Sequence, residues 1–316
     1  MDEYGFCNPP GLVSDIIVLG DSFAWCYEVK PTEIWVAQLH AYSLGTNGTG
    51  PQAYLQLLKR YGLSRKPKLV ILNIYAGNDL FDAAAYEAYR TRWKDVEAPP
   101  CSLPPALCSM YRSLKDGFVG RRSYAFNTIV HTLRVMRDEY HTGSAEAPQP
   151  NLLYHIGDTA SNIDNDGNLV RIASGDIPDF SLFDKPLDEF AELAKAHGFQ
   201  ALITYTPMEF SVYSEQIVFD DAKRTFSRGQ ILAFGEDQRN YLGSAAKERN
   251  IPFLDLTSAL RTKSDLYFHR NLHWTPEGHR VVAEAVRREL RERSSLASAA
   301  GLGHEWFYGN IGESVR

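Results

Sequence analysis

Short apolar runs alternate along this chain with segments of helical periodicity. Four runs have the length and apolar content of buried strands, at residues 15–19, 68–75, 200–206 and 251–256. Apolar residues at helical spacing predict helices at residues 32–42, 52–61, 186–197, 231–249 and 276–293. Strands that alternate with helices are typical of a parallel sheet with helices on both faces. The pattern therefore predicts an α/β fold with a mainly parallel sheet.

Residues from about 84 to 180 interrupt this alternation. They contain loop signals such as Ala98-Pro99-Pro100, many aromatic residues and one segment of helical spacing at 124–140. We interpret them as an insertion or lid over the sheet. We expect residues 1–316 to form a single domain.

Composition and charge exclude several classes of protein. Hydrophobic residues make up 44% of the chain and charged residues 23%, as in a globular protein with a large core. The net charge of −6 offers no basic footprint, so we expect no nucleic-acid partner. No apolar run approaches the roughly 18 residues that span a bilayer, so we expect no integral membrane segment. The acidic first residues also lack the apolar core of a signal peptide.

The four cysteines fall into two pairs by environment. Cys101 and Cys108 lie in a Pro-rich segment with six residues between them, where they could pair if the protein is exported. Cys7 and Cys26 are expected to be small packing residues.

Two candidate motifs directly follow predicted strands. Gly20-Asp21-Ser22 ends the first strand, where a serine can serve as a nucleophile or simply cap a helix. Gly77-Asn78-Asp79 ends the next, where the Asn78 amide can donate to a developing oxyanion or form a turn. Active sites of parallel α/β sheets lie beyond the carboxyl ends of the strands, which favours the chemical interpretation of both.

Two further motifs lie in loops. Residues 45–51 are rich in glycine, and Gly48 can expose a backbone N–H to a ligand or merely form a turn. His273 precedes a helix whose expected N-cap is Thr275 and whose first residue is Pro276. Its imidazole can serve as a base for a serine or be a satisfied loop histidine. No cysteine or carboxylate lies at ligand spacing among His269, His273 and His279, and His279 should lie on the helix, so we expect no metal.

In order and spacing these four motifs resemble the blocks of the SGNH hydrolases, also called GDSL esterases. The resemblance implies a three-layer α/β/α, flavodoxin-like fold without metal or organic cofactor. It implies that Ser22 is the nucleophile and His273 the general base. It also implies an oxyanion hole made by the N–H groups of Ser22 and Gly48 and the amide of Asn78.

Residues 2–6, the loop at 48–52 and residues 273–278 are similar to a narrower subgroup, the O-acetyl esterases and acetyltransferases of bacterial polysaccharides. This similarity implies a small-molecule or carbohydrate ester as substrate and favours a location outside the cytoplasm. The function expected first is a serine esterase that acts through an acyl-enzyme on Ser22. An O-acyltransferase with the same residues is the first alternative, and a non-catalytic carbohydrate-binding protein is the second.

The sequence departs from the family pattern just before His273. The family usually has an aspartate two or three residues before this histidine, whereas this chain has Arg270 and Asn271. Asn271 can accept a hydrogen bond from the imidazole but cannot stabilise the imidazolium by charge. A natural Ser-His-Asn site, a Ser-His dyad and an engineered replacement of aspartate all remain open. Asp265 lies nearby, but its spacing does not fit.

We predict that Asn271→Asp raises ester turnover, because a carboxylate stabilises the imidazolium that forms during acyl transfer. The reverse change in a trypsin-like protease lowers turnover by roughly 10⁴-fold. Initial rates of ester hydrolysis by the wild type and the variant test this. An unchanged or lower rate in the variant would contradict the prediction.

Overall fold

The computed structural model describes residues 1–93, 152–156, 159–163, 167–219, 228–268 and 272–299. Its main sheet has the strand order β2-β1-β3-β6-β8, and every neighbouring pair is parallel. These strands are β1 (Ile16–Leu19), β2 (Tyr42–Ser43), β3 (Leu69–Tyr75), β6 (Gln200–Thr206) and β8 (Phe253–Asp255). Counted along the chain within this sheet, the order is 2-1-3-4-5, as in flavodoxin-like folds. The predicted α/β fold with a mainly parallel sheet is confirmed.

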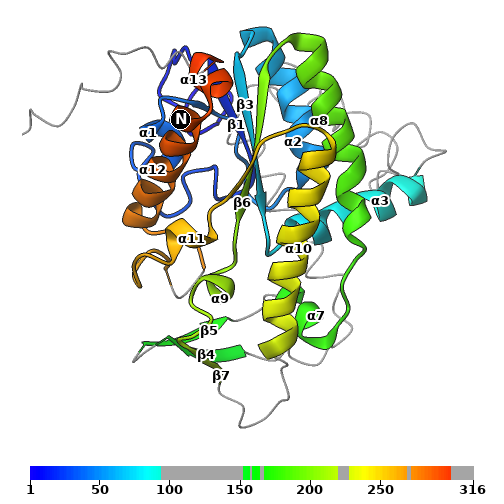
Figure 1. Ribbon diagram of the computed structural model, residues 1–316, viewed down its shortest axis with the longest axis vertical. Helices are drawn as coiled ribbons and strands as arrows, with labels where there is room; N and C mark the ends of the chain where they lie inside the picture. The colour runs from blue at the N-terminus through cyan, green and yellow to red at the C-terminus, as the bar shows by residue number, and fades with distance from the viewer. Residues whose placement is uncertain (94–151, 157–158, 164–166, 220–227, 269–271, 300–316) are drawn as a thin grey trace, which may run out of the picture.

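Helices cover both faces of the main sheet, which gives the molecule three layers (Figure 1). One face carries α1 (Trp35–Gln38), α12 (Pro276–Glu292) and α13 (Ser294–Ala299), and the other carries α2 (Pro51–Leu57), α8 (Asp184–His197) and α10 (Arg228–Glu248). Shorter or peripheral helices are α3 (Asp79–Trp93), α7 (Gly167–Ser174), α9 (Glu209–Val212) and α11 (Thr257–Leu260). A π-helical turn (Leu58–Gly62) and two 3₁₀ turns (Leu63–Arg65 and Phe180–Phe183) complete the set. Among these described helices, none combines the length and apolarity needed to cross a bilayer.

The central strands are buried on both faces, which explains their continuous apolar sequences. All residues of β1 and β3 are buried, and in β6 only Gln200 is exposed. A strand between two helical layers has no solvent face, so no polar alternation is expected. Asn73 in β3 is a buried exception, and its Oδ1 accepts hydrogen bonds from the hydroxyls of Thr204 and Thr206 in β6.

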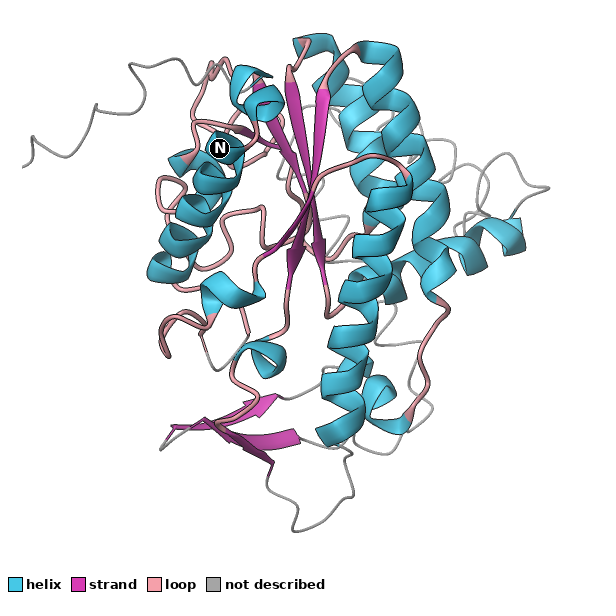
Figure 2. Cartoon of the chain, in the orientation of Figure 1, coloured by secondary structure: helices cyan, strands magenta, loops and turns pink. Residues whose placement is uncertain are grey.

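A second, antiparallel sheet lies past the carboxyl end of β6, beyond α9 (Figure 2). It has the order β5-β4-β7, from β5 (Thr159–Ile163), β4 (Leu152–Ile156) and β7 (Ile217–Phe219). The sequence analysis did not predict these strands. Most of the predicted insertion at 84–180, its helix at 124–140 and the pair Cys101 and Cys108 lie outside the described residues. The insertion and the single domain stay predictions.

The predicted helix at 32–42 is wrong in its second half. The helix α1 ends at Gln38, and Tyr42 and Ser43 form β2, which pairs with Ile17 and Val18 of β1. His40 has a left-handed backbone with φ of 52°, which a helix does not contain. Pairing with the first strand therefore takes precedence over the local helical periodicity.

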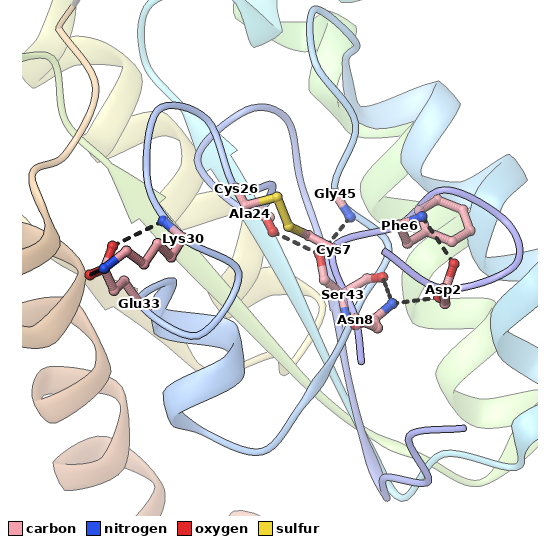
Figure 3. The surroundings of a disulfide bond; sticks show 10 residues. All are labelled: Asp2, Phe6, Cys7, Asn8, Ala24, Cys26, Lys30, Glu33, Ser43 and Gly45. Carbon is pink, nitrogen blue, oxygen red and sulfur yellow. Dashed lines mark hydrogen bonds and ion pairs between the residues drawn. A yellow bond between two sulfur atoms is a disulfide. The ribbon is translucent and has the colours of Figure 1, made fainter. Parts of the chain in front are cut away.

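The expectation that Cys7 and Cys26 are packing residues is also wrong, because they form a disulfide (Figure 3). Hydrogen bonds hold the same N-terminal segment in place. The Asp2 carboxylate accepts from Tyr42 Oη at 2.5 Å and from Asn8 Nδ2 at 2.9 Å. Asn8 Oδ1 accepts from the Ser43 N–H at 2.7 Å. The N-terminal segment is thereby fixed to β2 and, through the disulfide, to the loop that follows β1.

We predict that the double variant Cys7→Ala/Cys26→Ala is less stable to urea than the wild type. The disulfide joins residues 19 positions apart, and a closed loop of this size stabilises by about 3 kcal/mol through the entropy of the unfolded chain. Equilibrium unfolding followed by circular dichroism measures the difference. An equal unfolding free energy for the wild type and Cys7→Ala/Cys26→Ala would contradict the prediction.

Candidate active site

The loop after β1 presents Ser22 from a tight turn. Asp21 Oδ1 accepts a hydrogen bond from the Phe23 N–H at 2.9 Å, and the Asp21 carbonyl accepts from the N–H groups of Ala24 and Trp25. Ser22 is 7% exposed. The Trp35 indole donates to the Phe23 carbonyl at 2.9 Å, which ties the turn to α1. The serine hydroxyl is therefore held at the carboxyl edge of the sheet with little freedom.

His273 comes from the other end of the chain and meets this turn. Its Nε2 lies 2.7 Å from Ser22 Oγ. The segment before α12 fixes the histidine: the Phe268 N–H donates to the His273 carbonyl at 2.7 Å, and Tyr267 pairs with Trp274 in a β-bridge. The predicted N-cap is confirmed, since Thr275 Oγ1 accepts from the Gly278 N–H. Serine and imidazole thus have the separation that proton transfer requires.

Aromatic rings pack against the His273 imidazole. The Tyr27 ring centroid lies 4.2 Å from the imidazole centroid with planes at 27°, and the Phe23 centroid lies at 5.0 Å with planes at 21°. Both geometries are stacked. Trp274 packs edge-on against Phe23 and is fully buried. These contacts were not predicted from the sequence, although three aromatic residues, Phe23, Trp25 and Tyr27, lie within five positions of Ser22.

Asn271, the predicted third member of the site, lies outside the described residues together with Arg270. Asp265, considered there as a substitute, is exposed, and its backbone carbonyl accepts a hydrogen bond from Thr275 Oγ1. The role of Asn271 stays a prediction.

The glycine-rich loop is fixed at both ends. A Cβ on Gly45 would lie 2.5 Å from the Ala24 carbonyl carbon, so only glycine lets this loop touch the Ser22 turn. A Cβ on Gly50 would lie 2.7 Å from the Asp82 Cβ, which sets the other end against α3. Between them, Gly48 is exposed, has φ of 62° and leaves open space around its Cα. Gly45 and Gly50 allow the loop to pack closely against its neighbours. Gly48 is exposed, so a ligand can reach its backbone.

Asn78 begins the turn into α3. Its Nδ2 donates to Asp82 Oδ2 at 2.6 Å, four residues along the chain. This bond uses one of the two amide hydrogens and fixes the amide plane, so the second hydrogen stays available for another acceptor. The sequence analysis did not identify Asp82, although its i+4 spacing from Asn78 on a helix is a recognisable signal.

Three carboxyl groups gather beneath these loops. Burial, against the opposing effect of the bond from the Phe23 N–H and together with repulsion from Asp82, raises the pKa of Asp21 to about 7. Burial, then repulsion from Asp21, raises the pKa of Asp79 well above its ordinary value. Burial also raises the pKa of Asp82, against the opposing effect of its bond from Asn78. Repulsion from Asp82 contributes to the raised pKa of both Asp21 and Asp79.

Tyr54 links this acidic group to the glycine-rich loop. Its hydroxyl lies 2.6 Å from the Thr49 carbonyl and 2.6 Å from Asp79 Oδ1. A phenol has one hydrogen, so it cannot donate fully to both acceptors. A protonated Asp79 resolves this by donating to the Tyr54 oxygen while Tyr54 donates to Thr49. This arrangement agrees with the raised pKa of Asp79.

Other features near the carboxyl edge of the sheet have structural roles. Asp255 Oδ1 accepts from the Thr257 N–H at 2.9 Å at the start of α11, the capping role that the sequence analysis favours. His279 in α12 has a pKa lowered to about 3 by burial and by the charge of His273. Among the described residues, no three His, Cys, Asp or Glu side chains cluster as metal ligands do.

Comparisons with known proteins agree with this architecture. Residues 184–307 match the family model described as "SGNH hydrolase-like domain, acetyltransferase AlgX". The matched range includes His273 but not Ser22, Gly48 or Asn78. No curated protein matches the chain. The resemblance to the SGNH hydrolases is confirmed by the family match together with the sheet.

The solved structures that match the chain are distant from it in sequence. A protein from Desulfitobacterium hafniense DCB-2, assigned to the G-D-S-L family of lipolytic proteins, is 13% identical with a TM-score of 0.45, covering 86% of this chain and 97% of that one. TesA is 11% identical with a TM-score of 0.45 and coverages of 88% and 98%. The acetyl xylan esterase AlAXEase is 12% identical with a TM-score of 0.42 and coverages of 87% and 98%.

We predict that Asp21→Asn stabilises the protein relative to the wild type increasingly as the pH rises from about 4 to about 7. Because the folded pKa of Asp21 lies above the unfolded value of 3.8, the native state binds more protons in this window and loses stability as they leave. Asparagine keeps the acceptor for the Phe23 N–H without the ionisation. Taking the difference between variant and wild type removes the opposing contribution of His279.

Urea unfolding at several pH values measures this difference. The control is Asp237→Asn, which removes a carboxylate at an exposed position on α10. A pH-independent difference for Asp21→Asn would contradict the prediction.

Proposed function

We propose that the protein is a serine esterase of SGNH type, with Ser22 as nucleophile and His273 as general base. The observation that carries the proposal is the 2.7 Å hydrogen bond between Ser22 Oγ and His273 Nε2. A serine hydroxyl is a weak nucleophile until a base within hydrogen-bond distance accepts its proton. The half-buried imidazole at the rim of the sheet is such a base.

In this proposal Ser22 Oγ attacks the ester carbonyl carbon while His273 Nε2 takes the hydroxyl proton. The carbonyl oxygen becomes an oxyanion that accepts hydrogen bonds from the N–H groups of Ser22 and Gly48 and from Asn78 Nδ2. Fixed donors of this kind stabilise the transition state because they need no reorganisation as charge develops. The bond between Asn78 and Asp82 supports this role, since it fixes the amide before substrate binds.

Collapse of the tetrahedral intermediate breaks the bond to the alcohol oxygen, which takes the proton from the imidazolium and leaves. The acyl group then remains on Ser22 as an ester. Water attacks this acyl-enzyme with His273 again as base, and the acid is released. The acyl group stays on the protein between the two steps, so the proposed reaction uses no cofactor.

The substrate class we propose is an ester of a small acyl group on a carbohydrate. The matched family model is described as an acetyltransferase, and the sequence resembles O-acetyl esterases and acetyltransferases at several loops. The same description favours one alternative, transfer of the acyl group from Ser22 to a sugar hydroxyl in place of water. The Cys7–Cys26 disulfide supports a site of action outside the cytoplasm, because disulfides persist in oxidising compartments.

We predict that a fluorophosphonate labels Ser22 of the wild type and that Ser22→Ala abolishes labelling. The phosphonate forms its bond only with an activated serine, so His273→Ala should greatly slow the reaction. Mass spectrometry of the intact protein and its peptides locates the adduct. Ser14→Ala, at a partly buried serine just before β1, is the matched control and should label like the wild type. Absence of an adduct on Ser22 would overturn the esterase proposal and favour a binding protein.

Turnover of p-nitrophenyl esters from acetate to palmitate, with an acetylated polysaccharide alongside, then defines the acyl group. The proposal expects the fastest hydrolysis with acetate. Addition of an oligosaccharide acceptor separates the alternatives, because a transferase yields acylated sugar while an esterase yields only free acid. A preference for palmitate would contradict the proposed substrate class.

A further inference from the structure

Tyr27 is the residue whose contact with His273 the proposed chemistry leaves unexplained. Its ring lies nearly parallel to the imidazole at a centroid distance of 4.2 Å, closer than Phe23 at 5.0 Å. Tyr27 is only half-buried, whereas Phe23 is 1% exposed and belongs to the main core. Packing of the core therefore accounts for Phe23 but does not account for Tyr27.

We propose that Tyr27 is a positioning residue for His273, whose ring holds the imidazole in its orientation toward Ser22 and stabilises its protonated form. This inference rests on the proposed function. The face of an aromatic ring carries negative charge and attracts a cation that lies over it. A planar imidazolium stacked on a phenol presents its charge to that face.

The sequence gives this interaction particular weight. The three residues before His273 are Arg270, Asn271 and Leu272, so the chain has no carboxylate where related enzymes usually place one. During acyl transfer the imidazole gains a proton and a positive charge. The ring of Tyr27 supplies part of the stabilisation that a carboxylate would give.

The disulfide explains how the loop after β1 holds Tyr27 in place. Cys26, the preceding residue, is bonded to Cys7 in the N-terminal segment (Figure 3). That segment is anchored to β2 through Asn8 and Ser43. Ser43 Oγ donates to the Ala24 carbonyl at 2.7 Å, two residues before Cys26. The chain around Tyr27 is thus fixed to the sheet by one covalent bond and by hydrogen bonds.

Neighbouring titratable groups leave this effect measurable. His279, in α12, interacts electrostatically with His273, but burial first and the charge of His273 second lower the pKa of His279 to about 3. His279 is therefore neutral across the pH range in which an ordinary histidine titrates. The Ser22 hydroxyl faces Nε2 and carries no charge in this range. The Asp21 carboxyl group accepts a hydrogen bond from the Phe23 N–H, and its pKa is raised, mainly by burial, to about 7. Because Asp21 would therefore titrate in the same range as His273, the Asp21→Asn background is used to remove its contribution.

The test is an NMR titration of the His273 ring protons in full-length protein, assigned among the nine histidines by the loss of one signal in His273→Gln. Tyr27→Leu removes the aromatic face, and Tyr27→Gln provides a second non-aromatic variant should the first fold poorly. Tyr27→Phe keeps the ring. Tyr4→Leu is the matched control, because Tyr4 is 49% exposed and contacts another ring, that of Tyr61. Each variant is also measured in the Asp21→Asn background.

We predict that the titration midpoint of His273 moves to lower pH by about half a unit in Tyr27→Leu and Tyr27→Gln, because loss of the ring face destabilises the imidazolium. Tyr27→Phe and Tyr4→Leu should leave the midpoint unchanged. In ester hydrolysis, kcat/KM of the non-aromatic variants should fall about two- to fivefold, with the acidic limb of its pH profile moved in the same direction.

An unmoved midpoint in both folded non-aromatic variants would overturn the inference, as would a shift in Tyr27→Phe as large as that in Tyr27→Leu. A merely structural role would lower kcat/KM without moving the acidic limb. Failure of the proposed function has a different signature, namely no phosphonate adduct on Ser22 of the wild type. Normal phosphonate labelling of Ser22 together with an unmoved His273 midpoint would overturn this inference and leave the proposed function standing.

Discussion

Parallel pairing of β1 with both β2 and β3 is the constraint on which the candidate site depends. It places the carboxyl ends of three strands side by side. The loops that leave those ends carry Ser22, Gly48 and Asn78. The glycine-rich loop packs closely against the Ser22 turn at Gly45 and against α3 at Gly50, where a Cβ atom would not fit. If any of these strands were paired in another order, the three loops would not share one edge.

The fourth element of the site arrives from the far end of the chain. His273 reaches Ser22 across a separation of 251 residues, so their contact depends on how α12 and the segment before it pack. The buried Trp274 and the Thr275 cap fix that segment on one side of the histidine. Stacked rings from the Ser22 turn fix the imidazole itself. The histidine is therefore oriented by packing from both ends of the chain, whatever accepts a bond from its other nitrogen.

The carboxyl groups under the loops show that the site is not built for maximum stability. Burial raises the pKa of Asp21, Asp79 and Asp82, and repulsion from neighbouring carboxylates adds to the rise at Asp21 and Asp79. Such groups cost folding free energy at neutral pH, and the surrounding apolar core compensates for that cost. In return Asp82 orients the Asn78 amide, and Asp79 holds Tyr54 against the glycine-rich loop. Shifted pKa values of this kind are common at functional sites, where titratable groups are buried beside one another.

Sequence alone was sufficient for β1, β3, β6 and β8 of the main sheet and for the position of the motifs that follow its strands. Short continuous apolar runs that alternate with helical segments are typical of buried parallel strands, and parallel strands place the motifs that follow them on one side of the sheet. The cysteine pairing, the edge strand β2 and the side-chain contacts between loops were decided only by the tertiary structure. Four cysteines allow three pairings, and the path of the N-terminal segment selected Cys7 with Cys26. Residues 42 and 43 became a strand because β1 offered an unpaired edge. The stacking of Tyr27 on His273 and the bond of Asn78 to Asp82 likewise required coordinates, because side-chain contacts between loops follow from packing and leave no periodic trace in the sequence.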